Sequence, residues 1–188
     1  TMRIFSRGDV NKVDASKIDA YINRIATNDK EALGELYHIT SASVYGFALS
    51  ILKNMQDAED VLHDTYLKIY TSASGYKSKG KPLAWILTIT RNLSYMKIRE
   101  RKKTKDIPEE AWEQMFDNLP LVTSEDKLVL VTCMEKLSDV DRQIVMLHSV
   151  SGFKHREIAE LLSLPLSTVL SKYHRALKKL KVLLMEGN

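Results

Sequence analysis

The spacing of the apolar residues is the feature that most constrains this chain. Along most of its 188 residues, apolar side chains recur every three or four positions, which places them on one face of a helix. No stretch alternates apolar and polar residues as a half-buried strand does. Gly and Pro are scarce, at 7 and 4 residues, which favours long helices over a turn-rich sheet protein. The sequence therefore predicts an all-α fold.

A change in charge divides the chain. Residues 106–122 contain several Asp and Glu but no Lys or Arg, and they include both Pro108 and Pro120. Such a segment is typical of a domain boundary. We therefore expect a flexible N-terminal arm over 1–15, a helical domain over 16–105, a flexible acidic linker over 106–122 and a second small helical domain over 123–188.

Local signals predict the ends of the helices. In the first domain, Ser16 is the expected N-cap of the first helix, and further helices are expected after Asn28, from Asp57 and from Pro82. Residues 71–81 are expected to form a flexible polar loop. The helix after this loop is expected to turn five apolar residues inward: Trp85, Ile86, Ile89, Leu93 and Met96. In the second domain the expected helices are 124–137, 139–149, 154–162 and 166–185.

The stretch EIAELLSLPLSTVLSKYHRALKKL, residues 157–180, has the pattern of a helix-turn-helix. Ser163-Leu164-Pro165 interrupts it because Pro cannot continue a helix, and Ser167 or Thr168 is the expected cap of the second helix. At the leading end, Ser167, Thr168 and Ser171 are candidates for contacts with base edges or phosphates. Further along the helix, the candidates for contacts with DNA, chiefly with its phosphates, are Lys172, His174, Arg175, Lys178 and Lys179.

No acid occurs from Leu161 to Leu184, which favours DNA binding over the alternative of a solvated basic helix face. A second basic cluster follows the Pro82 helix start. Its cations could follow a nucleic-acid backbone and its aromatic and amide groups could contact unpaired bases, although a basic helix end can also serve only solubility. The candidates for DNA binding here are Arg91, Asn92, Tyr95, Arg99, Arg101 and Lys102, beside Lys97, Lys103 and Lys105.

An acidic helix precedes the second basic cluster. In DAEDVLHDTYLKIY, residues 57–70, the carboxylates of Asp57, Glu59, Asp60 and Asp64 are expected on the exposed side of the helix. Acidic residues in a first helical turn stabilise the helix without any further function. A surface of this kind would repel DNA, so the alternative is that it faces a basic protein partner.

The order of these three segments resembles the bacterial RNA polymerase sigma factors of the extracytoplasmic-function (ECF) type. The segments are DAEDVLHDTYLKIY, PLAWILTITRNLSYMKIRERKK and residues 137–180, and the resemblance extends over roughly residues 16–185. It implies two domains, regions two and four. It also implies that Asp57, Asp60, His63 and Asp64 dock on the beta-prime coiled coil of core RNA polymerase.

The resemblance assigns DNA contacts as well. Trp85, Arg91, Asn92 and Tyr95 would lie in the segment that melts and reads the −10 element, and residues 72–81 would correspond to the loop that captures a flipped-out base. The helix 166–181 would read the −35 element. The chain departs from common family residues at His63, Met96, Ser167 and Leu170, so its promoter preference cannot be taken from relatives.

We therefore expect a cytoplasmic sigma factor rather than an enzyme. Its expected partners are core polymerase (beta-prime and beta subunits), promoter DNA and an anti-sigma factor. We expect no cofactor, metal or membrane-spanning segment, because one Cys among 188 residues allows no thiolate cluster and no apolar run is long enough. Cys133 is expected in a core. The alternatives are a stand-alone helix-turn-helix regulator with an N-terminal interaction domain, and a helical adaptor that binds only proteins.

Overall fold

The computed structural model describes residues 14–101, 132 and 135–186, and these fall into two compact units. The first unit contains residues 14–101 and the second the residues from 132 onward. Every regular element in the described ranges is a helix, which confirms the predicted all-α class. The arm before residue 14 and the predicted linker over 106–122 lie outside the described residues, as do Cys133 and most of the predicted helix 124–137.

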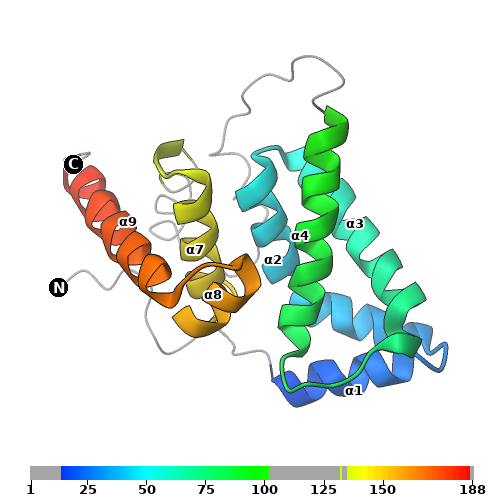
Figure 1. Cartoon of the computed structure of the whole chain (residues 1–188). Coiled ribbons are helices and arrows are strands. Elements are labelled where there is room, and N and C mark those ends of the chain that lie inside the picture. The colour runs from blue at the N-terminus through cyan, green and yellow to red at the C-terminus, as the bar shows by residue number, and fades with distance from the viewer. Residues whose placement is uncertain (1–13, 102–131, 133–134, 187–188) are drawn as a thin grey trace. The chain divides into compact units, whose positions relative to one another are not determined.

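Four α-helices and one short 3-10 helix build the first unit. They are α1 (Ala15–Ile25), α2 (Lys30–Leu52), α3 (Met55–Ser72), η1 (Ala73–Gly75) and α4 (Pro82–Arg101). The long helices α2, α3 and α4 pack on one another, and α1 packs on α2, η1 and α4. In Figure 1 the segment that joins α3 to α4 runs beside α1 at the edge of the unit, and η1 at its start packs on both α1 and α3.

The interior of the first unit is apolar with a few buried hydroxyls. Ile18 and Ile22 of α1 and Phe47 of α2 are almost fully buried. The Thr40 hydroxyl donates to the Leu36 carbonyl and lies 2.6 Å from the Tyr66 hydroxyl, which joins α2 to α3. Burial raises the pKa of the Tyr66 phenol above its ordinary value, so the phenol stays protonated as a buried hydrogen-bonding group.

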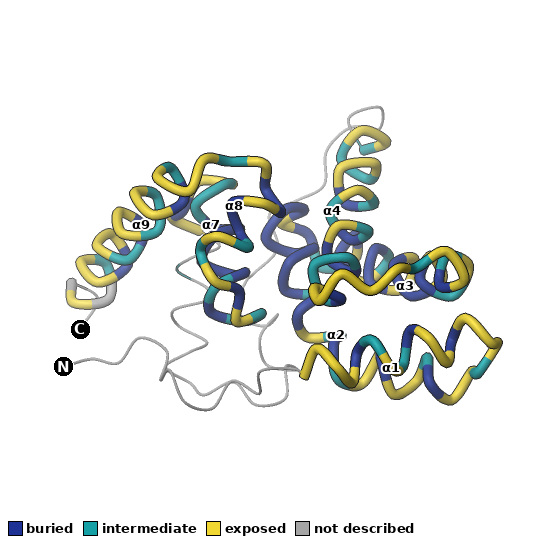
Figure 2. Tube along the Cα trace, turned by 60° about the horizontal axis from the view of Figure 1, so that its bottom comes forward, coloured by how far each residue is buried: buried dark blue, intermediate teal, exposed yellow. Residues whose placement is uncertain are grey.

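The second unit contains α7 (Asp139–Ser149), α8 (His155–Leu162) and α9 (Leu166–Glu186). Leu137, Val145, Ala176 and Leu180 form a buried cluster against which Tyr173 packs. Figure 2 shows buried residues along one side of α9 and exposed residues along the other, as the apolar spacing predicts. The helix 154–162 and the helix 166–185 are thereby confirmed to within a residue.

The tight connection between α8 and α9 has a definite geometry. Ser163 ends α8 in the left-handed conformation, with φ 55° and ψ 45°, and the Leu164 N–H donates to the Ala159 carbonyl at 2.9 Å. Pro165 then precedes α9. Ser167 and Thr168, predicted as caps, instead lie within the first turn of α9, because the Pro165 carbonyl already accepts from the Thr168 N–H.

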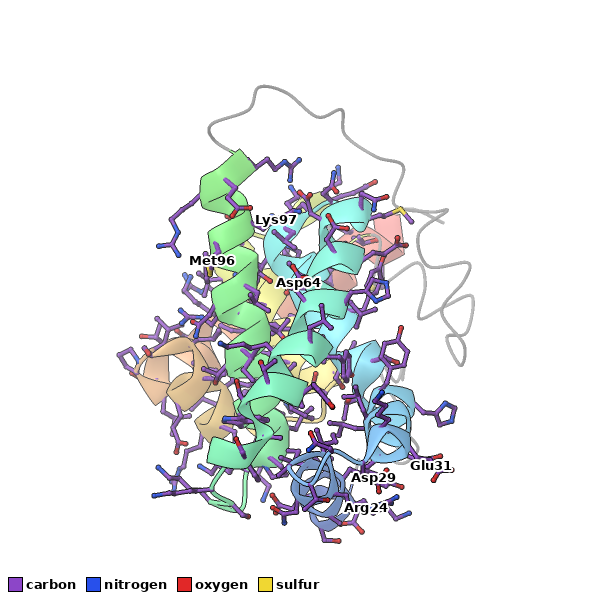
Figure 3. All side chains as sticks on the ribbon, turned by 90° about the vertical axis from the view of Figure 1, so that its right-hand side faces the viewer. Arg24, Asp29, Glu31, Asp64, Met96 and Lys97 are labelled. Atoms are coloured by element: carbon purple, nitrogen blue, oxygen red, sulfur yellow. The ribbon has the colours of Figure 1, made fainter. Side chains whose placement is uncertain are left out.

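Three other expectations need correction. The N-cap of α1 is Asp14 rather than Ser16: its carboxylate accepts from the Ser16 backbone N–H at 2.9 Å, and a charged oxygen is a strong acceptor for such a cap. The predicted loop 71–81 is shorter, because α3 continues to Ser72 and η1 follows. Of the five α4 residues predicted to point inward, only Ile86 is buried. Met96 is 48% exposed, and Figure 3 shows it on the side of α4 turned away from α3. The other three, Trp85, Ile89 and Leu93, are half-buried, because the buried side of α4 runs through Leu87, Thr90 and Ser94 instead.

Candidate nucleic-acid interface

The outer side of α9 carries the polar and basic residues that follow the tight turn. Val169, Ala176 and Leu180 are buried against the unit. Because these three residues fix one side of the helix inward, the positions on the opposite side must face out. The exposed polar and basic residues of the first four turns, called the α9 surface below, are Ser167, Ser171, His174, Arg175, Lys178 and Lys179.

The predicted DNA-binding residues of α9 are not equivalent. Lys172 is half-buried, and its Nζ lies 3.4 Å from Asp141 Oδ1 on α7. The Lys179 ammonium donates to the Lys136 carbonyl at 2.6 Å, although the residue is exposed. Arg175 Nε donates to the Ser171 carbonyl at 3.3 Å, which directs the guanidinium along the helix toward its leading end. Two of the predicted cations therefore also fasten α9 to its own unit.

A cluster of rings supports α9 from beneath. His148 of α7 and His155 of α8 stack at 4.6 Å between ring centroids, and Tyr173 of α9 presents an edge to both. His148 Nδ1 donates to the Phe153 carbonyl at 2.8 Å, since a carbonyl only accepts. Burial lowers the pKa of His155, and its neighbours His148 and His174 lower it further. The cluster thus favours a neutral His155 and connects all three helices.

In the first unit, two of the acidic residues predicted to dock on polymerase, both on α3, form ion pairs with α4. Asp57 is buried rather than exposed, and its carboxylate lies 3.1 Å from Arg101 Nη1. Asp60 Oδ2 lies 2.9 Å from Lys97 Nζ. The hydrogen bond from Lys97 lowers the pKa of Asp60, and the same bond raises the pKa of Lys97. The prediction that these carboxylates line the exposed side is therefore wrong for Asp57, because the basic end of α4 covers it.

The other two predicted docking residues, His63 and Asp64, are exposed on α3. Figure 3 shows Asp64 on α3 and Lys97 where α4 approaches it. Asp64 therefore belongs to the part of the acidic helix that remains accessible in the first unit, as does the exposed Glu59 five residues earlier.

The DNA candidates on α4 lie in different environments. Asn92, Tyr95 and Arg99 are exposed, while Arg91 is half-buried with its guanidinium 5.3 Å from the centre of the Tyr95 ring. The buried Nε of Arg91 has no hydrogen-bond partner among the described residues. Arg101 is engaged with Asp57, and Lys102 lies outside the described residues.

Sequence reasoning missed one residue near the α3–α4 connection. Asp19 of α1 accepts hydrogen bonds from the hydroxyls of Tyr76 and Ser78, and the Tyr76 ring packs on Trp85 at 4.7 Å between centroids. Nothing in the local pattern identifies Asp19, because an acid on the polar side of an amphipathic helix is ordinary. Its partners lie almost sixty positions later in the chain.

Neither a metal centre nor a membrane-spanning helix emerges from the described ranges. Within them, no three His, Cys, Asp or Glu side chains are grouped so that they could hold a metal ion. None of the helices there is both long enough and apolar enough to cross a bilayer.

Comparisons with known proteins agree on a single family. Residues 36–104 match sigma-70 region 2 and residues 127–180 match sigma-70, region 4, which together cover more than half of the chain. The chain is 27% identical over 175 residues to the ECF RNA polymerase sigma factor SigK of Mycobacterium tuberculosis, covering 89% of this chain and 93% of that protein. SigK of Mycobacterium sp. strain KMS is 27% identical over 172 residues, covering 87% and 89%.

Two solved structures share the fold. The sigma factor RpoE of Bartonella quintana, in complex with the anti-sigma factor NepR, matches with a TM-score of 0.65 at 22% identity, over 81% of this chain and 96% of that one. CnrH, in complex with the cytosolic domain of CnrY, matches with a TM-score of 0.63 at 20% identity, over 92% and 99%. With both family regions in order and curated relatives matched along most of its length, this chain belongs to the sigma-70 family as an extracytoplasmic-function sigma factor, a non-enzymatic factor for transcription initiation.

Proposed function

We propose that this sigma factor binds core RNA polymerase through α3, recognises the −35 element with α9, and recognises and melts the −10 element with α4 and the segment before it. The observation that carries the proposal is the α9 surface, whose exposed hydroxyls and cations, with Leu170 among them, follow the tight turn at Ser163. A helix-turn-helix inserts the N-terminal part of its second helix into the major groove.

For the −35 element, the proposal assigns two kinds of contact. Ser167, Ser171 and Arg175 lie on the leading half of α9 and are the candidates for base edges. Lys178 lies further along and is the candidate for a phosphate contact. Lys172 and Lys179 would first have to exchange their partners in the unit for DNA, so we assign them weaker contributions.

For the −10 element, the exposed Asn92, Tyr95 and Arg99 offer an amide, an aromatic ring and a cation along α4. These groups suit unpaired bases and the phosphates between them. Arg91 supports this face because its guanidinium packs on the Tyr95 ring. Strand separation would then draw on the binding energy of the unpaired strand, with no chemical step by the sigma factor.

For core polymerase, His63 and Asp64 are the best candidates because both are exposed on α3. We propose that they meet a basic helical surface of the polymerase. The relatives of known structure are bound to other proteins, one of them the anti-sigma factor NepR. An anti-sigma protein is therefore the proposed regulator of this chain, and it would act by covering its binding surfaces.

The test is capture of core polymerase by the purified chain, followed by run-off transcription from a promoter library. The proposal expects a stoichiometric complex and start sites that require both chain and core. A stand-alone helix-turn-helix regulator would bind duplex DNA tightly without core polymerase. A helical adaptor would bind protein and show no salt-dependent DNA affinity. Either result would overturn the proposal.

A further inference from the structure

The segment between η1 and α4 is held in place from α1. The carboxylate of Asp19 uses both of its oxygens: one accepts from the Tyr76 hydroxyl, and the other accepts from the Ser78 hydroxyl at 2.9 Å. The Tyr76 ring is fixed a second time by Trp85 of α4, at 4.7 Å between centroids. Asp19 therefore joins α1 to this segment, and Tyr76 joins the segment to α4. We call these three residues, Asp19, Tyr76 and Ser78, the Asp19 clamp.

The clamp determines which residues of the segment face outward. Tyr76 has extended backbone angles, φ −66° and ψ 134°, so the chain leaves η1 without continuing a helix. Tyr76 and Ser78 are turned toward Asp19, and Lys77 and Lys79 beside them are exposed. Two cations are thus presented outward on a short segment that contains Gly80 at φ 74°.

The Tyr76 phenol of the clamp stays protonated at neutral pH. Burial and the neighbouring Asp19 raise the pKa of Tyr76 to about 12, so the phenol remains a protonated donor. Both partners of the carboxylate are neutral hydroxyls. Asp19 therefore holds the segment through hydroxyls rather than through an ion pair with Lys77 or Lys79.

We propose that Asp19 is a positioning residue for recognition of the unpaired promoter strand: it pre-organises residues 76–80 so that Lys77 and Lys79 meet the phosphates of that strand beside α4. This inference rests on the proposed function, and it extends recognition to α1, which precedes the part of the chain that matches sigma-70 region 2. A segment already ordered before binding does not lose that conformational freedom when the strand arrives.

The first experiment tests the clamp without DNA. Limited trypsin digestion, followed by mass spectrometry, reports cleavage after Lys77 and Lys79. Wild-type chain should resist, and Asp19→Ala and Tyr76→Phe should be cut at least fivefold faster at these two positions, because local opening controls proteolysis. Glu31→Gln is the matched control, since it removes one exposed negative charge of the same unit away from the segment. Equal cleavage in all variants would show that Asp19 holds nothing.

The second experiment tests recognition with the holoenzyme. Binding of a single-stranded oligonucleotide carrying the non-template −10 sequence is measured beside binding of duplex −35 DNA and of core polymerase. Asp19→Ala should weaken single-strand binding about tenfold, and Asp19→Asn should weaken it less, because an amide oxygen still accepts one hydroxyl. Asp19→Ala combined with Tyr76→Phe should be no worse than Asp19→Ala alone. Duplex and core affinities should stay unchanged.

The outcomes distinguish a failure of the proposed function from a failure of the positioning role of Asp19. If wild-type holoenzyme does not prefer the −10 oligonucleotide to a scrambled one, the proposed function fails. If it does and the Asp19 variants bind that oligonucleotide as wild type does, the positioning role fails alone. If the variants lose single-strand, duplex and core binding in equal proportion, Asp19 serves only the fold, and this also overturns the inference.

Discussion

A charged residue cannot be assigned to a partner from its local pattern alone, as Asp57 and Asp60 show. Both fit an acidic docking surface by spacing, but α4 supplies their nearest cations, Arg101 and Lys97. The low pKa of Asp60 means that its bond with Lys97 stabilises the unit above the unfolded-state pKa and is lost as the pH falls. The pair is partly exposed, so its contribution is about 1 kcal/mol or less.

Asp64 therefore offers the cleaner test of polymerase docking. Asp64→Lys reverses an exposed charge on α3 and should weaken core polymerase binding at least tenfold, because close interfacial charge pairs couple by roughly 1.5–7 kcal/mol. The measurement is titration of core polymerase with labelled chain, with thermal unfolding to show that the fold survives. Glu31→Lys, the same reversal on α2, should bind as wild type does. Unchanged affinity of Asp64→Lys would exclude α3 from the contact.

His155 should make the second unit sensitive to mild acid. Its pKa in the folded chain is lowered below the ordinary 6.5, so the unfolded chain binds the proton more readily and stability falls as the pH drops through that value. His155→Phe keeps a ring against His148 and Tyr173 and should flatten this dependence. Urea unfolding of the full-length chain between pH 7 and 5, followed by a signal from the second unit, measures it. If this variant were as acid-sensitive as wild type, a group other than His155 would cause the loss of stability.

At the scale of single elements, helix spacing was predicted well and helix ends less well. The apolar repeat is a local property, so the bounds of α7, α8 and α9 follow from it to within a residue, although it predicted the wrong inward face for most of α4. Ends depend on which neighbouring side chain reaches a free N–H, and Asp14 accepts where Ser16 was expected. Contacts such as those of Asp19, Asp57 and Lys179 join distant segments, and no local pattern contains them.

The N-terminus of α3 should depend on Asn54. This residue is buried, and its side-chain oxygen accepts from the Asp57 N–H at 2.8 Å. Asn54→Ala leaves that donor unsatisfied and should lower the free energy of unfolding by about 1 kcal/mol, within a range of roughly 0.5–2. Asn54→Asp keeps an acceptor and should restore most of the loss. Chemical denaturation of the three proteins measures this, and an Ala variant as stable as wild type would contradict the cap.

The α9 surface should separate into reading and anchoring residues. Lys178→Ala should weaken binding to all promoters and reduce the salt slope by about one unit, the signature of one phosphate contact. Arg175→Ala should instead change which −35 sequences are used, with about 1–3 kcal/mol lost at one base position. Transcription by the holoenzyme on a randomised −35 library scores both. If Arg175→Ala lowers every promoter equally, α9 anchors the sigma factor without reading sequence.

At the scale of the whole molecule, each of the two units carries a different part of the proposed function. The first, residues 14–101, holds the α3 docking residues, the α4 face and the Asp19 clamp, and the second holds the α9 surface. Each unit alone would have a short recognition site. If both bind one promoter while held by the same polymerase, the second contact is effectively intramolecular and greatly strengthens the first. Specificity would then lie in the distance between the two DNA elements as well as in their sequences.

Promoter spacing tests this division directly. Inserting 5 base pairs between the −35 and −10 elements turns them to opposite sides of the DNA, since one helical turn is about 10–10.5 base pairs. Run-off transcription should fall at least tenfold, whereas an insertion outside the two elements should have no effect. The affinity of the free chain for a duplex that carries the −35 element should be the same with and without the 5 inserted base pairs, because that contact involves α9 alone. Transcription that tolerates the insertion would mean that the two units do not engage the promoter together.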